Sequence, residues 1–231
     1  MIKKATSLLL ILAGLCTLAQ AQDVKPGDAT QGAGKAAMCI GCHGIVGYQA
    51  SFPEIYKVPM ISGQGGKYIV ASLQAYAKGE RKHPTMRGIA ASLSDQDMAD
   101  LAAYYESQGK GAGNTLVAAG NAAAKAAPDA LKDRMAACVA CHGANFSAPI
   151  DPAYPRLAGQ HADYLQASLR AYHTDGNPQV GRSNAVMRSQ VVQEANGKKK
   201  LTFTPSELKQ VAAYIASLPG ELKVTPQQGI R

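Results

Sequence analysis

The chain has 231 residues with a formal net charge of +8, no Trp and three Phe. This length accommodates two small domains or one of ordinary size. A positive balance is weak evidence for a nucleic acid or an anionic membrane as partner, and the sequence lacks the interleaved basic and aromatic residues of a nucleic-acid binder. We therefore expect no nucleic acid partner.

The first 21 residues have the pattern of a secretory signal peptide. Lys3 and Lys4 form a short positive segment, residues 5–19 are uncharged and rich in Leu, and a small-x-small cleavage site ends at Ala21. The apolar run is short for a membrane span. These features predict export and cleavage after Ala21, which would place the mature protein in the periplasm.

Two other interpretations of this segment stay open, a lipid anchor at Cys16 and an uncleaved N-terminal anchor. Lipoprotein processing prefers a small residue before the cysteine, whereas Leu15 is bulky. Cleavage would leave four of the five cysteines and lower the net charge to +6, because Lys3 and Lys4 would be removed. Whether the mature protein is free or loosely held at the membrane is also left open.

The four remaining cysteines fall in two Cys-x-x-Cys-His segments, residues 39–43 and 138–142, which lie 99 positions apart. This spacing is typical of haem attachment, because two thiols add to the porphyrin vinyl groups and the adjoining histidine reaches the iron. Two disulfides or a four-cysteine zinc site are the alternatives, and neither needs a histidine after each pair. The motif predicts two covalently attached haems, with these thioether anchors and proximal ligands: Cys39, Cys42, Cys138 and Cys141, then His43 and His142.

Further matching segments show that the chain is a tandem duplication. Residues 59–64 align with residues 155–160 at an offset of 96, and five identities follow at the same offset. The Gly-rich residues 109–114 form the seam. We therefore divide the mature chain into an N-terminal domain at 22–110 and a C-terminal domain at 111–231.

Each unit is expected to be all-α. A short helix runs into the Cys-x-x-Cys-His motif, and a middle helix and a terminal helix follow, separated by loops. The terminal helices carry an i, i+3, i+4, i+7 apolar pattern from Met98 and from Leu208, and each begins at a capping residue, Ser94 or Thr204. Units this small and this poor in large apolar side chains need help to form a core, and a haem would supply it.

The second unit carries one additional element. Residues 190–203 alternate loosely around Asn196-Gly197, a strong signal for a two-residue turn. We expect a short β-hairpin there with its lysines exposed. A solvated turn is the preferred interpretation of these lysines and a docking patch is the alternative: Lys198, Lys199 and Lys200.

The sixth iron ligand is expected to be a methionine, because Met/His ligation raises the reduction potential of haem iron. Met60 and Met98 align with other residue types in the second unit and are predicted to be packing residues, and Met135 lies on the proximal side. Met86 and Met187 lie in corresponding loops between the middle and terminal helices, 43 and 45 residues after their histidines. We predict Met86 and Met187 as the axial ligands.

Histidines are the rivals for this position. His83 competes with Met86 in the first unit, and His161 or His173 competes in the second. His161 follows a Gly-Gln pair and is predicted instead to cap a helix or to face solvent.

Other residues are candidates for supporting roles. The carbonyls preceding Pro59 and Pro155 are candidates to orient the proximal imidazoles, and Arg81, Arg170 and Arg182 are candidates to offset propionate charge. A further set shares helix faces at i, i+4, i+8 spacing and is expected to meet propionates, to line the contact between the domains or simply to pack: Tyr68, Ser72, Tyr76, Tyr164, Ser168 and Tyr172.

Together these motifs resemble the cytochrome c4 family of two-domain periplasmic electron carriers. The resemblance rests on the two haem motifs, the two Pro-x-x-x-Gly-Gln segments, the two methionine loops, and residues 93–105 and 154–164, and it covers nearly all of the mature chain. It implies two class I cytochrome c folds, the predicted methionines as distal ligands, and haems close enough to exchange electrons. Residues 62–67 differ from 158–163 and the hairpin is confined to the second unit, which leaves the domain interface and the partner surface open.

The leading functional hypothesis is an electron carrier without substrate chemistry, because an iron held by His and Met has no open position. The resemblance implies a haem–copper terminal oxidase as electron acceptor, and we expect a donor such as a quinol:cytochrome c reductase and a monomeric protein. The alternative is a dihaem enzyme, a thiosulfate dehydrogenase or a peroxidase-like protein, with one open or labile site. A third hypothesis is a haem subunit bound permanently to a larger complex.

Overall fold

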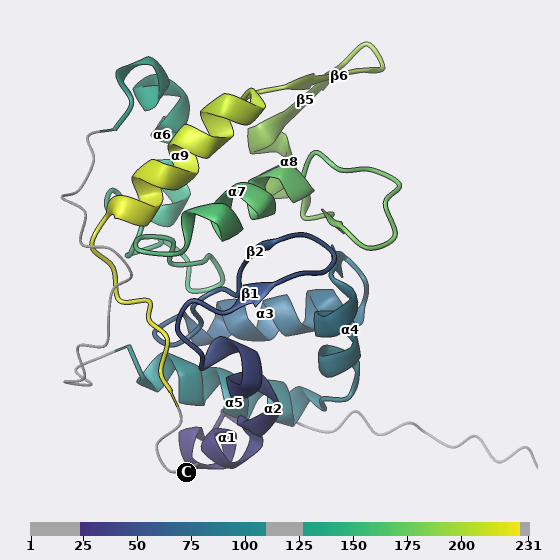
Figure 1. Ribbon diagram of the computed structural model, residues 1–231, viewed down its shortest axis with the longest axis vertical. Coiled ribbons are helices and arrows are strands. Elements are labelled where there is room, and N and C mark those ends of the chain that lie inside the picture. Colours follow the sequence, from purple (N-terminus) through teal and green to yellow (C-terminus); the bar gives the residue numbers. More distant parts are fainter. Residues whose placement is uncertain (1–23, 110–126, 227–231) are drawn as a thin grey trace, which may run out of the picture.

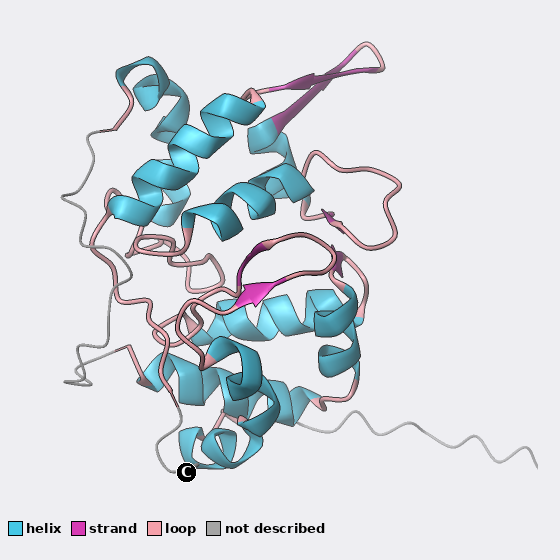
Figure 2. Cartoon of the chain, in the orientation of Figure 1, coloured by secondary structure: helices cyan, strands magenta, loops and turns pink. Residues whose placement is uncertain are grey.

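The computed structural model describes residues 24–109 and 127–226, so the predicted signal peptide at 1–21 and most of the predicted seam at 109–114 lie outside the described residues. Two helical halves are stacked on each other (Figure 1), with short strand pairs at their edges (Figure 2). The N-terminal helices are α1 (Ala29–Lys35), α2 (Ala37–His43), α3 (Gly66–Ala77), α4 (Pro84–Ala91) and α5 (Asp95–Ser107). The C-terminal helices are α6 (Lys132–His142), which follows a short 3-10 turn at Asp129–Leu131, α7 (Ala162–Ala171), α8 (Ala185–Val191) and α9 (Pro205–Ser217).

Six short strands complete the described part of the chain and form three antiparallel pairs. The first pair is β1 (Gln49–Ala50) with β2 (Tyr56–Lys57), the second is β3 (Arg81–Lys82) with β4 (Gly181–Arg182), and the third is β5 (Val192–Ala195) with β6 (Lys198–Leu201). The pair β3–β4 joins the two halves. The mostly helical two-domain fold that we predicted is therefore confirmed.

The two terminal helices form as their capping residues predict. Ser94 accepts a hydrogen bond from the backbone of Asp97, whose carboxylate accepts from the backbone of Ser94, and this reciprocal box opens α5. Thr204 and Glu207 form the same box at the start of α9. Both helices have 13 residues and bury equivalent faces, which include Met98 and Leu208, so the prediction that Met98 is a packing residue is confirmed.

The predicted hairpin is also present. Strands β5 and β6 pair in register around Asn196 and Gly197, whose φ angles of 53° and 69° suit a tight two-residue turn. The hairpin lysines are exposed, although Lys199 donates to Asp175 and to the carbonyl of His173. One end of the hairpin is thereby tied to the loop that follows α7.

One feature of the predicted fold is wrong. Met86 and Met187 were expected in loops, but they lie in the first turns of α4 and α8. Pro84 starts α4 with a backbone conformation that suits the first helical position. These two helices have eight and seven residues, which is too short for a clear periodic pattern in the sequence.

Two glutamines join the halves through reciprocal hydrogen bonds. Gln160 accepts from the Met60 amide at 3.0 Å and donates to the Met60 carbonyl at 2.8 Å. Gln64 accepts from the Arg156 amide at 2.8 Å and donates to the Arg156 carbonyl at 2.9 Å. Because Gln64 aligns with Gln160 and Met60 with Arg156, this double contact is related by a pseudo-twofold axis.

The segment after α9 returns across the N-terminal half, where it is drawn in yellow in Figure 1. The Lys223 amide donates to the Ser62 carbonyl at 3.1 Å, and Leu222 and Val224 form a small buried cluster with Met60. Met60 is only 1% exposed, so its predicted role as a packing residue is confirmed. The C-terminal segment therefore holds both halves together.

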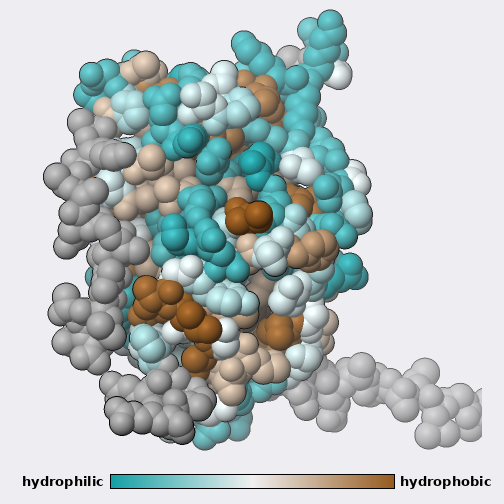
Figure 3. Space-filling view, in the orientation of Figure 1, coloured by the Kyte–Doolittle hydropathy of each residue, from teal (hydrophilic) through white to brown (hydrophobic). Residues whose placement is uncertain are grey.

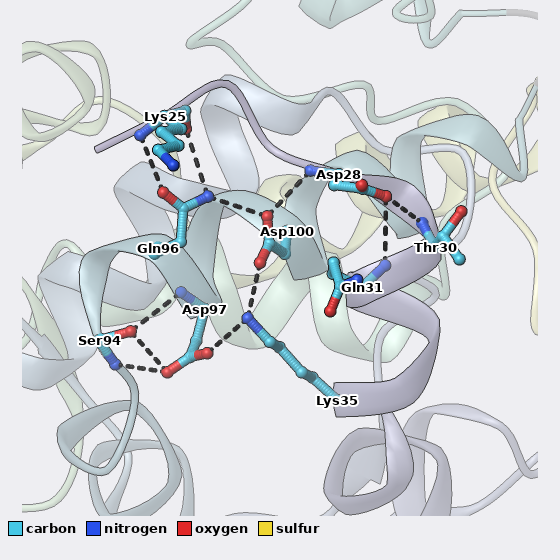
Figure 4. A network of polar contacts seen from close by, with 9 residues as sticks. All are labelled: Lys25, Asp28, Thr30, Gln31, Lys35, Ser94, Gln96, Asp97 and Asp100. Carbon is cyan, nitrogen blue, oxygen red and sulfur yellow. Dashed lines mark hydrogen bonds and ion pairs between the residues drawn. The ribbon is translucent and has the colours of Figure 1, made fainter. Parts of the chain in front are cut away.

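Within the N-terminal half, α1 packs closely against α5 and a polar network seals their edge (Figure 4). Lys35 donates to Asp100 at 2.6 Å and pairs with Asp97 at 2.7 Å. Asp100 also accepts from the backbone of Asp28, the N-cap residue of α1. The two carboxylates thus fix the start and the end of α1 on the same face of α5.

Removing the Asp97 carboxylate is expected to make the unfolding free energy less dependent on pH in the acidic range. The Lys35 ammonium and the Ser94 hydrogen bonds lower the pKa of Asp97 to about 2. Because the folded-state pKa is below the ordinary value of 3.8, this stabilisation is present above about pH 4 and is lost as the pH falls towards 2. We expect Asp97→Asn to lower the urea unfolding free energy at pH 7 by up to about 1 kcal/mol, and the difference to shrink by pH 2.5.

The matched control for this variant is Asp95→Asn, since Asp95 lies in the same first turn of α5. This control is expected to leave the pH dependence of the wild-type protein unchanged. A difference between Asp97→Asn and wild type that is as large at pH 2.5 as at pH 7 would contradict the electrostatic explanation.

Candidate haem-binding sites

Helices α2 and α6 each end at the histidine of a Cys-x-x-Cys-His motif. The i, i+3 spacing of the two cysteines places both sulfurs on one side of the helix, one turn apart. The four thiols are partly buried and form no disulfide among the described residues. Burial raises the pKa of the Cys39 and Cys138 thiols, which is the expected effect of an apolar pocket on a group that becomes charged.

Each histidine is oriented by a backbone carbonyl. His43 Nδ1 lies 2.8 Å from the carbonyl oxygen of Pro59, and His142 Nδ1 lies 3.0 Å from that of Pro155. We predicted that a backbone carbonyl near each proline orients the histidine, and this is correct. The carbonyl belongs to the proline itself, however, and not to the preceding residue. A Nδ1–H donor fixes the tautomer that leaves Nε2 free to bind a metal.

Burial also lowers the pKa of both histidines, so both rings are neutral at pH 7. For His43 the carbonyl of Pro59 opposes this effect, while the charge of Arg81 reinforces it. A neutral imidazole with one free nitrogen is the form that binds iron.

In the N-terminal half these residues face a cavity of about 370 Å³. Cys39, Cys42 and His43 lie on one side of it, and Met86 on α4 lines it as well. This volume is in the usual range of cofactor pockets, about 300–1,000 Å³. The remaining lining comes mostly from apolar side chains, among them Val58, Ile61, Ile69, Leu73, Ile89 and Leu101.

In the C-terminal half the corresponding residues converge on one apolar core. Cys138 and Met187 both pack against the cluster that contains Leu165, Leu208 and Val211. Met135, which we placed on the proximal side, is buried in the same cluster. The predicted anchor and the predicted methionine of this half therefore share one apolar environment.

The helix caps of α4 and α8 explain the position of both methionines. His83 accepts a hydrogen bond from the Met86 amide through Nδ1 at 3.3 Å, and Asn184 accepts from the Met187 amide at 3.0 Å. His83 and Asn184 are therefore equivalent N-cap residues. Asn is a common N-cap and His is not, so the sequence alone gave no sign of this role for His83.

The two other rival histidines have different surroundings. His161 stands at the N-cap position of α7 without a capping hydrogen bond from its side chain, and it is buried. The prediction that His161 begins a helix is therefore correct in position, although its side chain makes no capping bond, and the prediction of a solvent-exposed ring is wrong. Burial lowers the pKa of His161 and of His173, whose Nε2 atoms have no hydrogen-bond partner among the described residues.

The tyrosine and serine residues that share helix faces line the contact between the halves. Arg81 lies opposite Arg182 in the β3–β4 pair, and both guanidinium groups point at the same phenol. Tyr164 OH accepts from Arg81 at 2.5 Å and from Arg182 at 3.2 Å. Each arginine also donates to a serine of its own half, Arg81 to Ser72 and Arg182 to Ser168.

Neither arginine forms an ion pair with a carboxylate in the described ranges, and Arg81 is only 9% exposed. Arg81 is buried and Arg182 is partly buried, and two cations held side by side in this way are unfavourable unless an anion or hydrogen bonds compensate them. The third candidate, Arg170, instead forms an ion pair with Glu54 across the two halves. Of the three roles left open for the tyrosines and serines, the structure shows the contact between the domains, whereas the interdomain role of Gln64 and Gln160 was not predicted.

The residues present fit a covalently held haem in each half. Each half combines paired thiols on one helix face, an imidazole with its Nδ1 engaged, and a methionine placed by a capped helix. The N-terminal cavity is largely apolar, as required to exclude water from iron. This fold and these sites define a two-domain c-type cytochrome.

Comparison with known proteins gives a consistent result. The cytochrome c family model matches residues 29–109 and again 117–219. Cytochrome c4 of Azotobacter vinelandii is 35% identical over 227 residues, covering 93% of this chain and 99% of the relative. The crystal structure of reduced recombinant cytochrome c4 from Pseudomonas stutzeri is 28% identical with a TM-score of 0.56, covering 84% of this chain and all of that structure.

A further relative is named thiosulfate dehydrogenase electron acceptor, from Stutzerimonas stutzeri, and is 33% identical, covering 79% of this chain and 89% of that protein. Taken together, these matches show that the chain belongs to the cytochrome c4 family. It carries two covalently attached haem c groups and acts in electron transfer.

Proposed function

We propose that the protein is a periplasmic electron carrier in which both irons are held by histidine and methionine. The observation that carries this proposal is the repeated geometry of the two halves, in which a capped helix presents Met86 or Met187 and a carbonyl orients His43 or His142. The thioether anchors would be Cys39, Cys42, Cys138 and Cys141.

A haem held in this way supplies one-electron transfer at an iron without an open position. The chain's own residues hold the histidines in one tautomer, keep water out with apolar side chains, and fix the two halves relative to each other. Arg81 and Arg182 would offset the charge of the propionates, since Arg81 is buried, Arg182 is partly buried, and neither has a carboxylate partner among the described residues.

The hydrogen bond at His83 supports Met86 rather than His83 as the distal ligand. Its Nδ1 accepts from the Met86 amide, as Asn184 accepts from the Met187 amide in the other half. His83 also lines the cavity, but because its Nδ1 accepts this hydrogen bond, the neutral ring carries its proton on Nε2 and has no free nitrogen to bind iron while the cap is formed. The same argument supports a carrier over a dihaem enzyme, because both halves place a methionine in the equivalent position.

For the partners, we propose a haem–copper terminal oxidase as acceptor and a quinol:cytochrome c reductase as donor. The relative named as a thiosulfate dehydrogenase electron acceptor supports a carrier role and makes such a dehydrogenase an alternative donor. Among the described residues, no helix has the length and apolar character to cross a bilayer. Apolar side chains are exposed in the N-terminal half, where Figure 3 shows brown areas, and these would contact a partner: Met38, Ile45, Val46, Tyr48, Phe52 and Ile55.

The ligand assignment is tested by replacing each methionine with leucine in protein matured with haem. In the oxidised state we expect wild type to show the weak far-red methionine–iron band at the strength of two haems. Met86→Leu and Met187→Leu are each expected to lose half of it and to become partly high-spin. Met98→Leu, a core replacement of similar volume, is the control and should retain the full band.

His83→Asn completes this test, because it gives the first half the cap residue of the second. We expect it to keep the spectrum of wild type. If His83→Asn lost a ligand band while Met86→Leu kept it, His83 would be the ligand. A high-spin iron in the wild-type protein would support the enzyme hypothesis instead.

A further inference from the structure

The two halves differ at one buried position beside the first cysteine of each motif. Tyr105 and Ile215 are the eleventh residues of the 13-residue helices α5 and α9. Their backbones are equivalent in space, because the Gly63 amide donates to the Tyr105 carbonyl at 2.8 Å and the Gly159 amide donates to the Ile215 carbonyl at 3.2 Å. The same structural position therefore holds a phenol in one half and an aliphatic side chain in the other.

The Tyr105 hydroxyl is a buried polar group in an apolar place. Tyr105 is 5% exposed, lines the N-terminal cavity, and packs in the cluster that Cys39 contacts. By distance and angle its hydroxyl completes no hydrogen bond within the described residues, although it lies near enough to the Cys39 sulfur to affect the pKa of that thiol. Leaving such a group unpaired costs about 1–3 kcal/mol, so its presence beside a cofactor pocket calls for a functional explanation.

Cys39 lines the same cavity as Tyr105 and packs against the same apolar cluster. Burial raises the pKa of the Cys39 thiol, and the Tyr105 hydroxyl acts in the opposite direction by stabilising negative charge on the sulfur. Burial also raises the pKa of Tyr105, so the phenol keeps its proton at neutral pH and can donate it in a hydrogen bond. In the other half Ile215 is 3% exposed and belongs to the core against which Cys138 packs, where it offers no dipole.

We propose that Tyr105 raises the reduction potential of the N-terminal haem by placing its O–H dipole beside the sulfur of Cys39 in the pocket that both residues line. The positive end of a fixed dipole near the cofactor favours the form with one more electron. This inference rests on the proposed attachment of a haem to Cys39. In this role Tyr105 acts through its electrostatic effect on the haem and does not contact a substrate.

The test is a redox titration of the haem-loaded protein and of Tyr105→Phe, which keeps the ring and removes only the hydroxyl. The Met86→Leu variant, which changes the proposed ligand of the N-terminal haem alone, shows which of the two measured potentials belongs to that haem. We expect the oxidised-to-reduced ratio of the N-terminal haem to rise about fivefold at a given potential, which is a decrease of about 40 mV for a one-electron couple. The potential of the C-terminal haem should stay as in wild type.

Tyr104→Phe is the matched control. Tyr104 is the preceding residue, its ring lies 5.1 Å from that of Tyr105, and it does not line the cavity. This variant should leave both potentials unchanged. An unchanged or higher N-terminal potential in Tyr105→Phe, or an equal change in both haems, would overturn the proposal.

A second measurement does not depend on how well Tyr105→Phe folds. The infrared difference spectrum between reduced and oxidised wild type is expected to contain a tyrosine C–O band, and Tyr104→Phe is expected to retain it. Absence of that band from wild type would refute the role of Tyr105. The proposed function has its own readout in the same samples, because two low-spin six-coordinate haems support it whether or not the potentials respond to Tyr105.

Discussion

Replacing Cys39 and Cys42 together with serine is expected to give a protein with one haem per chain and an N-terminal half that no longer folds stably. With these two residues as the proposed attachment points, the double variant cannot hold a haem covalently in that half. The cavity that they line has a volume of about 370 Å³. Without the haem, the apolar side chains around this cavity would lose the group that they pack against and would be exposed to water, which destabilises the N-terminal half.

The loss of this packing is expected to unfold the half because a whole domain is stable by only about 5–15 kcal/mol. We expect haem counting by absorbance and mass to give one haem per chain, and circular dichroism to show loss of helix. Cys138→Ser with Cys141→Ser is the reciprocal variant and should lose the other haem. Two haems per chain in either double variant would show that the attachment residues are assigned incorrectly.

Local features were the most predictable from the sequence. The capping residues Ser94 and Thr204 and the Asn196-Gly197 turn act within a few residues of themselves, so their outcome depends little on the rest of the fold. The duplication gave further information, because a methionine that aligns with another residue type in the second unit could be predicted to be a packing residue and not an iron ligand. Met60 and Met98 were correctly placed in this way.

Features that depend on distant contacts were not predictable. The hydrogen bonds of Gln64 and Gln160 join segments 92 and 100 positions apart, and no local pattern marks them. His83 resembled a ligand because its role in capping α4 is uncommon for histidine. The carbonyls that orient the proximal imidazoles were assigned one residue too early, since only the path of the folded backbone decides which carbonyl faces the ring.

Removing one of the two interdomain glutamines should have a large effect on stability. Gln160→Leu would leave both the amide and the carbonyl of Met60 without a partner. Met60 lies under Leu222 and Val224, so water cannot replace these hydrogen bonds. Each unpaired buried group costs about 1–3 kcal/mol, and we expect Gln160→Leu to lower the unfolding free energy by about 3–4 kcal/mol.

The other glutamine should matter less, although it makes the same pair of hydrogen bonds. Gln64 binds the backbone of Arg156, which is only partly buried, so water can partly replace the glutamine there. We therefore expect Gln64→Leu to cost about 1–2 kcal/mol. The two glutamines would then contribute unequally to the unfolding free energy, although their contacts are related by pseudo-twofold symmetry.

Denaturant unfolding of the haem-loaded protein measures these differences, with Gln210→Leu as an exposed control on α9 that should change stability by less than about 0.5 kcal/mol. In Gln160→Leu we also expect the unfolding of the two halves to separate into two transitions, because the contact that couples them is lost. Equal costs for Gln160→Leu and Gln210→Leu would mean that the C-terminal segment and the arginine pair at Arg81 and Arg182 hold the halves together without the glutamines. Separate transitions with a large cost would instead make the glutamine of each Pro-x-x-x-Gly-Gln segment the residue that joins two cytochrome domains into one cooperative unit.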